Sequence, residues 1–187
     1  MTGTASVAGR ERPRLFVGLV LPEDARRRVV AWQRDAFAGV DDVRVVPRQN
    51  LHVTVAFLGA RPADEVDGIV ACLRESAARA DVPALSARRY RETRSVGMLV
   101  LADSGDAAAA FAADVHEGLE RAGVYKPEAR PWLPHLTVVR FRRPPRLRPT
   151  VPDLGEISPS EAAVYHSLLR PTGAQYEIVE SVPLGRE

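Results

Sequence analysis

Two short motifs in the sequence place a hydroxyl group two residues after an imidazole. His52 precedes Thr54 and His135 precedes Thr137, both in the pattern His-apolar-Thr-Val. The two motifs are separated by close to half of the 187-residue chain. Such an internal repeat indicates two related halves, each contributing one histidine and one threonine to a common site.

Both motifs lie in apolar segments that we expect to form β-strands, in which successive side chains point to opposite faces. Each histidine then projects from the same face as its threonine. In the first motif the opposite face takes Val53, Val55 and Phe57, which we expect to pack. If the halves pack as similar lobes about an approximate two-fold axis, the strands lie side by side and four polar groups converge on one cleft.

Two facing imidazoles suit a reaction in which one group removes a proton while another supplies one, because histidine titrates near neutral pH. Neighbouring hydroxyls can donate hydrogen bonds to non-bridging phosphate oxygens. The combination predicts in-line attack of water on a phosphodiester, with one histidine as base and the other protonating the leaving oxygen. This chemistry needs no metal or other cofactor, and no Asp or Glu lies within several residues of either motif.

The charge of the chain is nearly balanced, with 26 basic and 24 acidic residues and a formal net charge of +2. Net charge alone therefore does not indicate a nucleic-acid binder. The segment 129–152, however, contains no Asp or Glu and six arginines. It is either an anion-attracting stretch or the solvated loop of an Arg-rich protein that has a single lysine, Lys126.

The remaining composition excludes several protein classes. A single cysteine, Cys72, cannot form an intrachain disulfide or a CxxC metal site, so we expect a packing role for it and a reducing, cytoplasmic location for the protein. No apolar run is long enough to span a membrane. We expect residues 1–13 to form a flexible tail and residues 14–187 to form one domain, and we expect a monomer.

Periodicity predicts an α+β fold with antiparallel sheets, because several links between strands are too short for a parallel crossover. Helices are expected from Pro22 to near Gly39, over 64–80, and around 111–119 with an end at Gly123. The expected strands cover 15–21, 43–46, 50–58, 85–91, 96–102, 135–141, 162–169 and 175–182.

From Arg14 onward the sequence resembles the two-histidine phosphoesterase superfamily, and within it the bacterial and archaeal RNA 2′,3′-cyclic phosphodiesterases, also called 2′-5′ RNA ligases. The segments that carry the resemblance are RLFVGLVLP, NLHVTVAFLG, PHLTVVRF and VYHSLLRPTGAQYEIV. The resemblance implies a bilobal, pseudo-two-fold arrangement of antiparallel sheets, with helices packed outside and a central cleft.

The resemblance also implies an activity. A 2′,3′-cyclic phosphate on an RNA end, or on a small cyclic nucleotide, would be opened to a 2′-phosphate without a metal, with reversible 2′-5′ RNA ligation as a possible second reaction. His52 would be the proton donor and His135 the proton acceptor. Thr54, Thr137 and Arg140 would bind the phosphate.

Two alternative functions stay open on the sequence. One is an RNA-end-binding module without significant turnover, against which the intact His and Thr pairs argue. The other is a metal-dependent hydrolase that uses both histidines as ligands.

Arg140 poses a difficulty, because strand alternation places it with Leu136 and Val138, on the face away from His135. It reaches the phosphate only if a bulge, twist or strand end follows Thr137.

Other aromatic and imidazole side chains have simpler interpretations. Trp132 either stacks on a nucleobase or packs in the core. We expect His116 and His166 to be core histidines with satisfied hydrogen bonds, and Tyr165 and Tyr176 to pack rather than contact substrate.

Overall fold

The computed structural model describes residues 12–171 and 173–185. Residues 1–11 of the expected tail lie outside this part of the chain. Residues 12 and 13 do not behave as a free tail, because Pro13 is buried and its carbonyl accepts a hydrogen bond of 2.9 Å from the Arg61 backbone N–H. Pro13 therefore packs against the domain.

Each expected helix and strand is present. The helices are α1 (Glu23–Ala36), α2 (Val66–Arg79) and α3 (Ala107–Arg121). The strands are β1 (Arg14–Val20), β2 (Val43–Val45), β3 (His52–Ala60), β4 (Ala84–Glu92), β5 (Val96–Ser104), β6 (His135–Phe141), β7 (Glu161–Arg170) and β8 (Gly173–Pro183). Several ends differ from the prediction by a few residues, and β3 and α2 begin later than expected because single 3-10 turns, Arg48–Asn50 and Ala63–Glu65, precede them.

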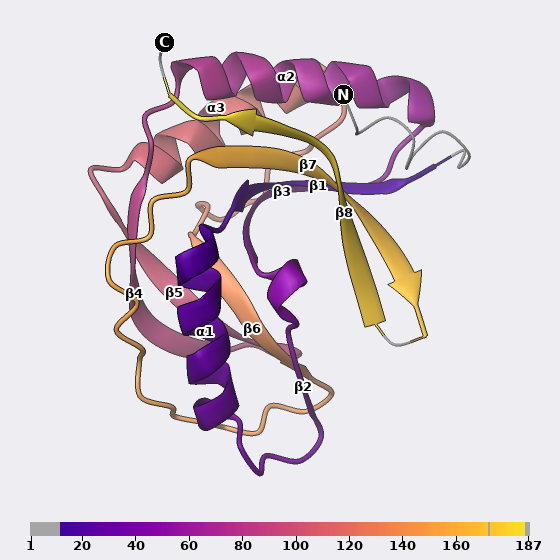
Figure 1. Cartoon of the computed structure of the whole chain (residues 1–187). Coiled ribbons are helices and arrows are strands. Elements are labelled where there is room, and N and C mark those ends of the chain that lie inside the picture. Colours follow the sequence, from indigo (N-terminus) through magenta and orange to yellow (C-terminus); the bar gives the residue numbers. More distant parts are fainter. Residues whose placement is uncertain (1–11, 172, 186–187) are drawn as a thin grey trace.

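In the described part of the chain, eight strands form one antiparallel sheet in the order β4-β5-β6-β3-β1-β7-β8, with β2 also paired to β6 (Figure 1). This confirms the predicted α+β class. The sheet has two parts, which we call the β3 half-sheet (β1, β3, β7 and β8) and the β6 half-sheet (β2, β4, β5 and β6). A single pair of residues, Val53 and Leu136, joins the β3 and β6 ladders.

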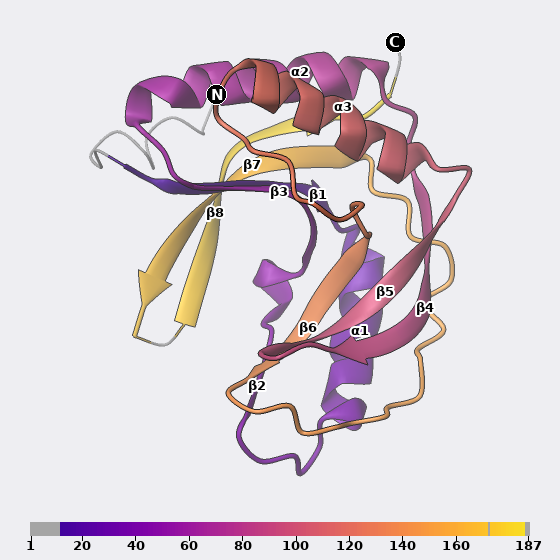
Figure 2. The same cartoon turned by 180° about the vertical axis from the view of Figure 1, so that it is seen from behind.

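Helices α1, α2 and α3 divide between the two half-sheets. Helices α2 and α3 lie together over the β3 half-sheet, whereas α1 lies over the β6 half-sheet (Figures 1 and 2). Helix α1 is fixed by the buried amide of Gln33, which donates hydrogen bonds to the carbonyls of Val46 and Val138. Within the described ranges, no helix has both the length and the apolarity needed to cross a bilayer.

Most of the core is one apolar cluster that includes helix and strand residues, with Cys72 packed at its margin. A second, smaller cluster lies on the β3 half-sheet around Phe16 and Tyr165, whose rings stack at 4.7 Å. Both tyrosines pack as predicted, since Tyr176 lies against this cluster, but Tyr176 also lines a cavity that both His-x-Thr motifs line. His166 is 1% exposed and occupies a core position, also as predicted.

Candidate active site

The two His-x-Thr motifs meet where the half-sheets join. Val53 and Leu136, the only paired residues of β3 and β6, are the central residues of the two motifs. The flanking histidines and threonines all line one cavity of about 890 Å³. The expectation that the two motifs lie on adjacent strands and face one space is therefore correct.

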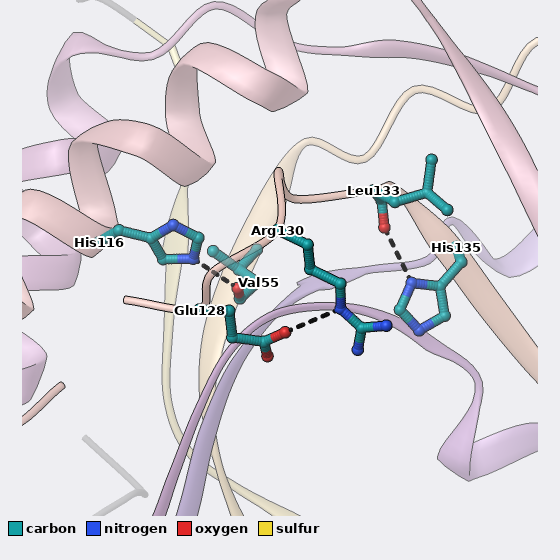
Figure 3. A network of polar contacts seen from close by, with 6 residues as sticks. All are labelled: Val55, His116, Glu128, Arg130, Leu133 and His135. Carbon is teal, nitrogen blue, oxygen red and sulfur yellow. Dashed lines mark hydrogen bonds and ion pairs between the residues drawn. The ribbon is translucent and has the colours of Figure 1, made fainter. Parts of the chain in front are cut away.

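Each histidine ring is oriented by the same local hydrogen bond. Nδ1 of His135 lies 2.9 Å from the Leu133 carbonyl oxygen (Figure 3), and Nδ1 of His52 lies 2.7 Å from the Asn50 carbonyl oxygen. A carbonyl only accepts, so Nδ1 carries a hydrogen in both rings. In both motifs this leaves Nε2 as the ring nitrogen available for proton transfer.

The His52 ring is enclosed by aromatic side chains. Its centroid lies 4.7 Å from that of Phe16 and 5.3 Å from that of Tyr176, which meets it edge-on. Nε2 of the neutral ring accepts a hydrogen bond of 2.9 Å from the Thr54 hydroxyl. Gly18 supplies the space beside the ring, because a Cβ there would lie 3.3 Å from His52 Cδ2 and 3.0 Å from the Val53 carbonyl.

This enclosure determines the charge of His52. Burial lowers the pKa of His52 from 6.5 to about 4, and the nearby positive charges of His135, Arg140 and Arg26 act in the same direction. The hydrogen bond to Asn50 opposes them. His52 is therefore neutral at pH 7 in the substrate-free cavity.

A bulge in β6 resolves the difficulty with Arg140. Thr137 is paired with Met98 and Val139 with Gly97, so Val138 has no opposite residue on β5. Beyond this extra residue the alternation is reversed. The Arg140 side chain consequently lines the same cavity as Thr137, as the sequence required of a phosphate-binding residue.

Comparison with known proteins identifies the family. The sequence profile described as "2'-5' RNA ligase superfamily" matches residues 21–169. The chain belongs to this superfamily. It is 31% identical to the RNA 2′,3′-cyclic phosphodiesterase of Thermus thermophilus, across 93% of this chain and 91% of that protein. It is 23% identical to the protein of the same name from Methanocaldococcus jannaschii, across 89% and 98% of the two chains.

Solved structures show the same fold. Escherichia coli LigT complexed with 3′-AMP superposes with a TM-score of 0.82 at 21% identity, covering 94% of this chain and 100% of that one. A Thermus thermophilus protein superposes with a TM-score of 0.79 at 28% identity, covering 93% and 99%. Other E. coli LigT crystals contained phosphate or ATP.

The prediction for Phe57 is wrong. Phe57, expected on the packed face, is 65% exposed and lines the cavity with His52 and Thr54. The cause is a second bulge: Thr54 is paired with Gly18 and Ala56 with Val17, so Val55 is the extra residue. Phe57 thereby joins the face that carries the histidine.

Trp132, for which base stacking or core packing was expected, and His116, expected in the core, both bind the β3 backbone beside the site. Trp132 Nε1 donates to the Thr54 carbonyl at 3.0 Å, and His116 Nε2 donates to the Val55 carbonyl at 2.8 Å (Figure 3). His116 has its hydrogen bond, as predicted, but it is half-buried and lines the cavity rather than the core. β3 pairs with β6 only through Val53, and these two contacts hold the next residues of β3, Thr54 and Val55, in place.

The described residues contain no group of three or more His, Cys, Asp or Glu side chains arranged to hold a metal ion. The polar groups that the two motifs direct into the cavity are two imidazoles and two hydroxyls, and guanidinium groups lie beside them.

Proposed function

We propose that the protein hydrolyses the 2′,3′-cyclic phosphate at an RNA end to a 2′-phosphate, without a metal. The observation that carries the proposal is the convergence of both His-x-Thr motifs and Arg140 on one cavity. The activity named for the Thermus and Methanocaldococcus relatives supports it.

The reaction follows from the groups present. A water molecule attacks phosphorus opposite the 3′ oxygen, one histidine accepts the proton of the water, and the P–O3′ bond breaks. The other histidine protonates the departing 3′ oxygen, and the 2′-phosphate monoester remains. Thr54, Thr137 and Arg140 donate to the non-bridging oxygens, on which negative charge develops. In the free site the Thr54 hydroxyl donates to His52 Nε2, so it turns to the phosphate on binding.

We assign proton donation to His52 and acceptance to His135, as the resemblance implies. Since His52 is neutral in the free cavity at pH 7, it must take up a proton when the anionic substrate binds. The negative phosphate raises the pKa that burial and the neighbouring cations have lowered. Calorimetric titration with a 2′-nucleotide product in two buffers of different ionisation enthalpy measures this uptake. If the product binds without proton uptake, the assignment is reversed, with His52 as the proton acceptor and His135 as the donor.

The two half-sheets then act as two lobes related by an approximate two-fold axis, each contributing one His-x-Thr motif to a central cleft. The same groups support 2′-5′ RNA ligation. When the 5′-hydroxyl of a second RNA replaces water as the nucleophile, breaking P–O3′ leaves a 2′-5′ phosphodiester and a free 3′-hydroxyl.

The test is incubation with excess chelator and an RNA that ends in a 2′,3′-cyclic phosphate, followed by identification of the product isomer. We expect a 2′-phosphate. Loss of activity in chelator that is restored by a divalent metal would favour the metal-dependent alternative. Tight binding without product would favour the RNA-end-binding module.

A further inference from the structure

The cavity contains more positive charge than the proposed reaction uses. Besides Arg140, the β6 half-sheet directs Arg44 and Arg91 into it. Across residues 12–171 and 173–185, none of these three has an ion pair or hydrogen bond to a carboxylate. The single acidic residue lining this part of the structure, Glu128, is paired with Arg130 at 3.2 Å (Figure 3).

Arg44 and Arg140 are directly opposite each other on β2 and β6. Directly opposite residues of antiparallel strands have Cα atoms about 5 Å apart and point to the same face. Like charges in this arrangement destabilise a sheet unless an anion lies between or beside them. Both side chains are exposed to the cavity, where an anionic ligand would supply that charge.

Arg44 also lies at the junction of the half-sheets. A Cβ on Gly173 would be 3.2 Å from Arg44 Nη1, so the guanidinium lies against the first residue of β8. The start of β8 is held next to the first motif, because Asn50 Nδ2 donates to the Ala174 carbonyl at 2.7 Å. Arg44 thus lies beside Arg140 on the β6 half-sheet, and its guanidinium reaches the β3 half-sheet at the start of β8.

We propose that Arg44 binds a second phosphate of the substrate, the internal phosphodiester immediately 5′ to the cyclic phosphate. A guanidinium binds a phosphate through two parallel N–H donors. This inference rests on the proposed function and specifies its substrate class: an RNA chain of two or more nucleotides, in preference to a mononucleoside cyclic phosphate.

Arg91 is less suited to this phosphate. It is opposite Met98, which is opposite Thr137, so Arg91 is two strands from the second motif with an apolar side chain between them. Arg44 is one strand from Arg140, and no residue of the sheet separates them.

The test compares Arg44→Ala with the wild-type protein on three substrates. These are a 2′,3′-cyclic mononucleotide, a dinucleotide with the same cyclic end, and that dinucleotide with an uncharged methylphosphonate link. Arg27→Ala removes an exposed arginine of α1 that does not line the cavity, and so controls for net charge.

We expect Arg44→Ala to lower the ratio of kcat/KM for the dinucleotide to that for the mononucleotide about 10-fold. In the wild-type protein, replacing the internal phosphodiester by the methylphosphonate should lower this ratio by the same factor. In Arg44→Ala the same replacement should have no further effect. For the dinucleotide, the slope of log kcat/KM against log salt concentration should be less steep by about 0.7 in Arg44→Ala than in the wild-type protein. This is the value for one phosphate contact on a single strand. Arg27→Ala should leave the ratio and the slope as they are.

An unchanged ratio in Arg44→Ala overturns the inference, whether both substrates lose activity equally or neither does. An equal loss would mean that Arg44 binds the cyclic phosphate itself. If the wild-type protein hydrolyses neither substrate, the proposed function fails, which is a separate result.

Discussion

The two half-sheets present different surfaces to the same cavity. The β3 half-sheet provides Phe57 and Tyr176 and encloses His52 among aromatic rings. The β6 half-sheet provides arginines. No aromatic ring of the described residues packs against His135. Two nearly identical sequence motifs with the same Nδ1 hydrogen bond therefore have unlike surroundings, and for His52 these surroundings favour the neutral ring.

The largest effect is expected from removing either imidazole. His52→Ala and His135→Ala should each lower kcat by about 10² to 10⁴, the range for a positioned general acid or base. Single-turnover assays at several pH values check this and should show that the two variants lose opposite limbs of the pH–rate profile. A variant that keeps full activity removes its histidine from the mechanism. Thermal melts of both variants control for loss of folding.

Arg140→Ala tests what the arginines of the β6 half-sheet contribute to the reaction. We expect a loss of about 10² in kcat/KM, because a charged donor to the developing phosphoryl charge is removed. The loss should be similar on mononucleotide and dinucleotide substrates, unlike that of Arg44→Ala. Unchanged kinetics would mean that the bulge at Val138 brings Arg140 into the cavity without giving it contact with the phosphate.

Strand alternation predicted the site only as far as the strands are regular. It placed His52 with Thr54 and His135 with Thr137 correctly, since no bulge interrupts either pair. It failed at Phe57, one bulge later. Val55, the bulged residue, is not a glycine or proline, so no local signal distinguishes it.

For Arg140 the sequence stated the condition, a bulge after Thr137, but could not show that it is met. The roles of Trp132 and His116 were beyond local reasoning for another reason. They bind carbonyls distant in sequence, and such contacts depend on how far the pairing of β3 with β6 extends. Helix and strand positions, by contrast, follow periodicity within the chain and were predicted closely.

The buried His52 should also make stability depend on pH. Its pKa is about 4 in the folded protein and near 6.5 when unfolded. Between these values the unfolded chain binds a proton that the folded protein does not, so the free energy of unfolding falls as the pH is lowered from 6.5 toward 4. The difference between pH 7 and pH 5 is about 2 kcal/mol.

Urea unfolding of the wild type and of His52→Gln at both pH values measures this effect. The variant lacks the titrating group, so the difference between its two values should be smaller by that amount. An equal difference in both proteins would show that His52 is protonated as readily in the fold as outside it.

The smallest expected effect comes from the glycine that makes room for His52. In Gly18→Ala the new Cβ would press on the Val53 carbonyl and on His52 Cδ2, so the ring must shift by a few tenths of an ångström. We expect kcat to fall about 10-fold, because positioning errors well below 1 Å already weaken proton transfer.

Gly68→Ala is the matched control. Gly68 lies in α2, where an added Cβ meets nothing within 4 Å, so activity should be unchanged and stability should rise by about 0.5 to 1 kcal/mol. Among the glycines that the structure describes, none has a comparable position beside His135. If Gly18→Ala keeps full activity, the tight aromatic enclosure of His52 is not what sets its position, and the Nδ1 hydrogen bond common to both motifs suffices.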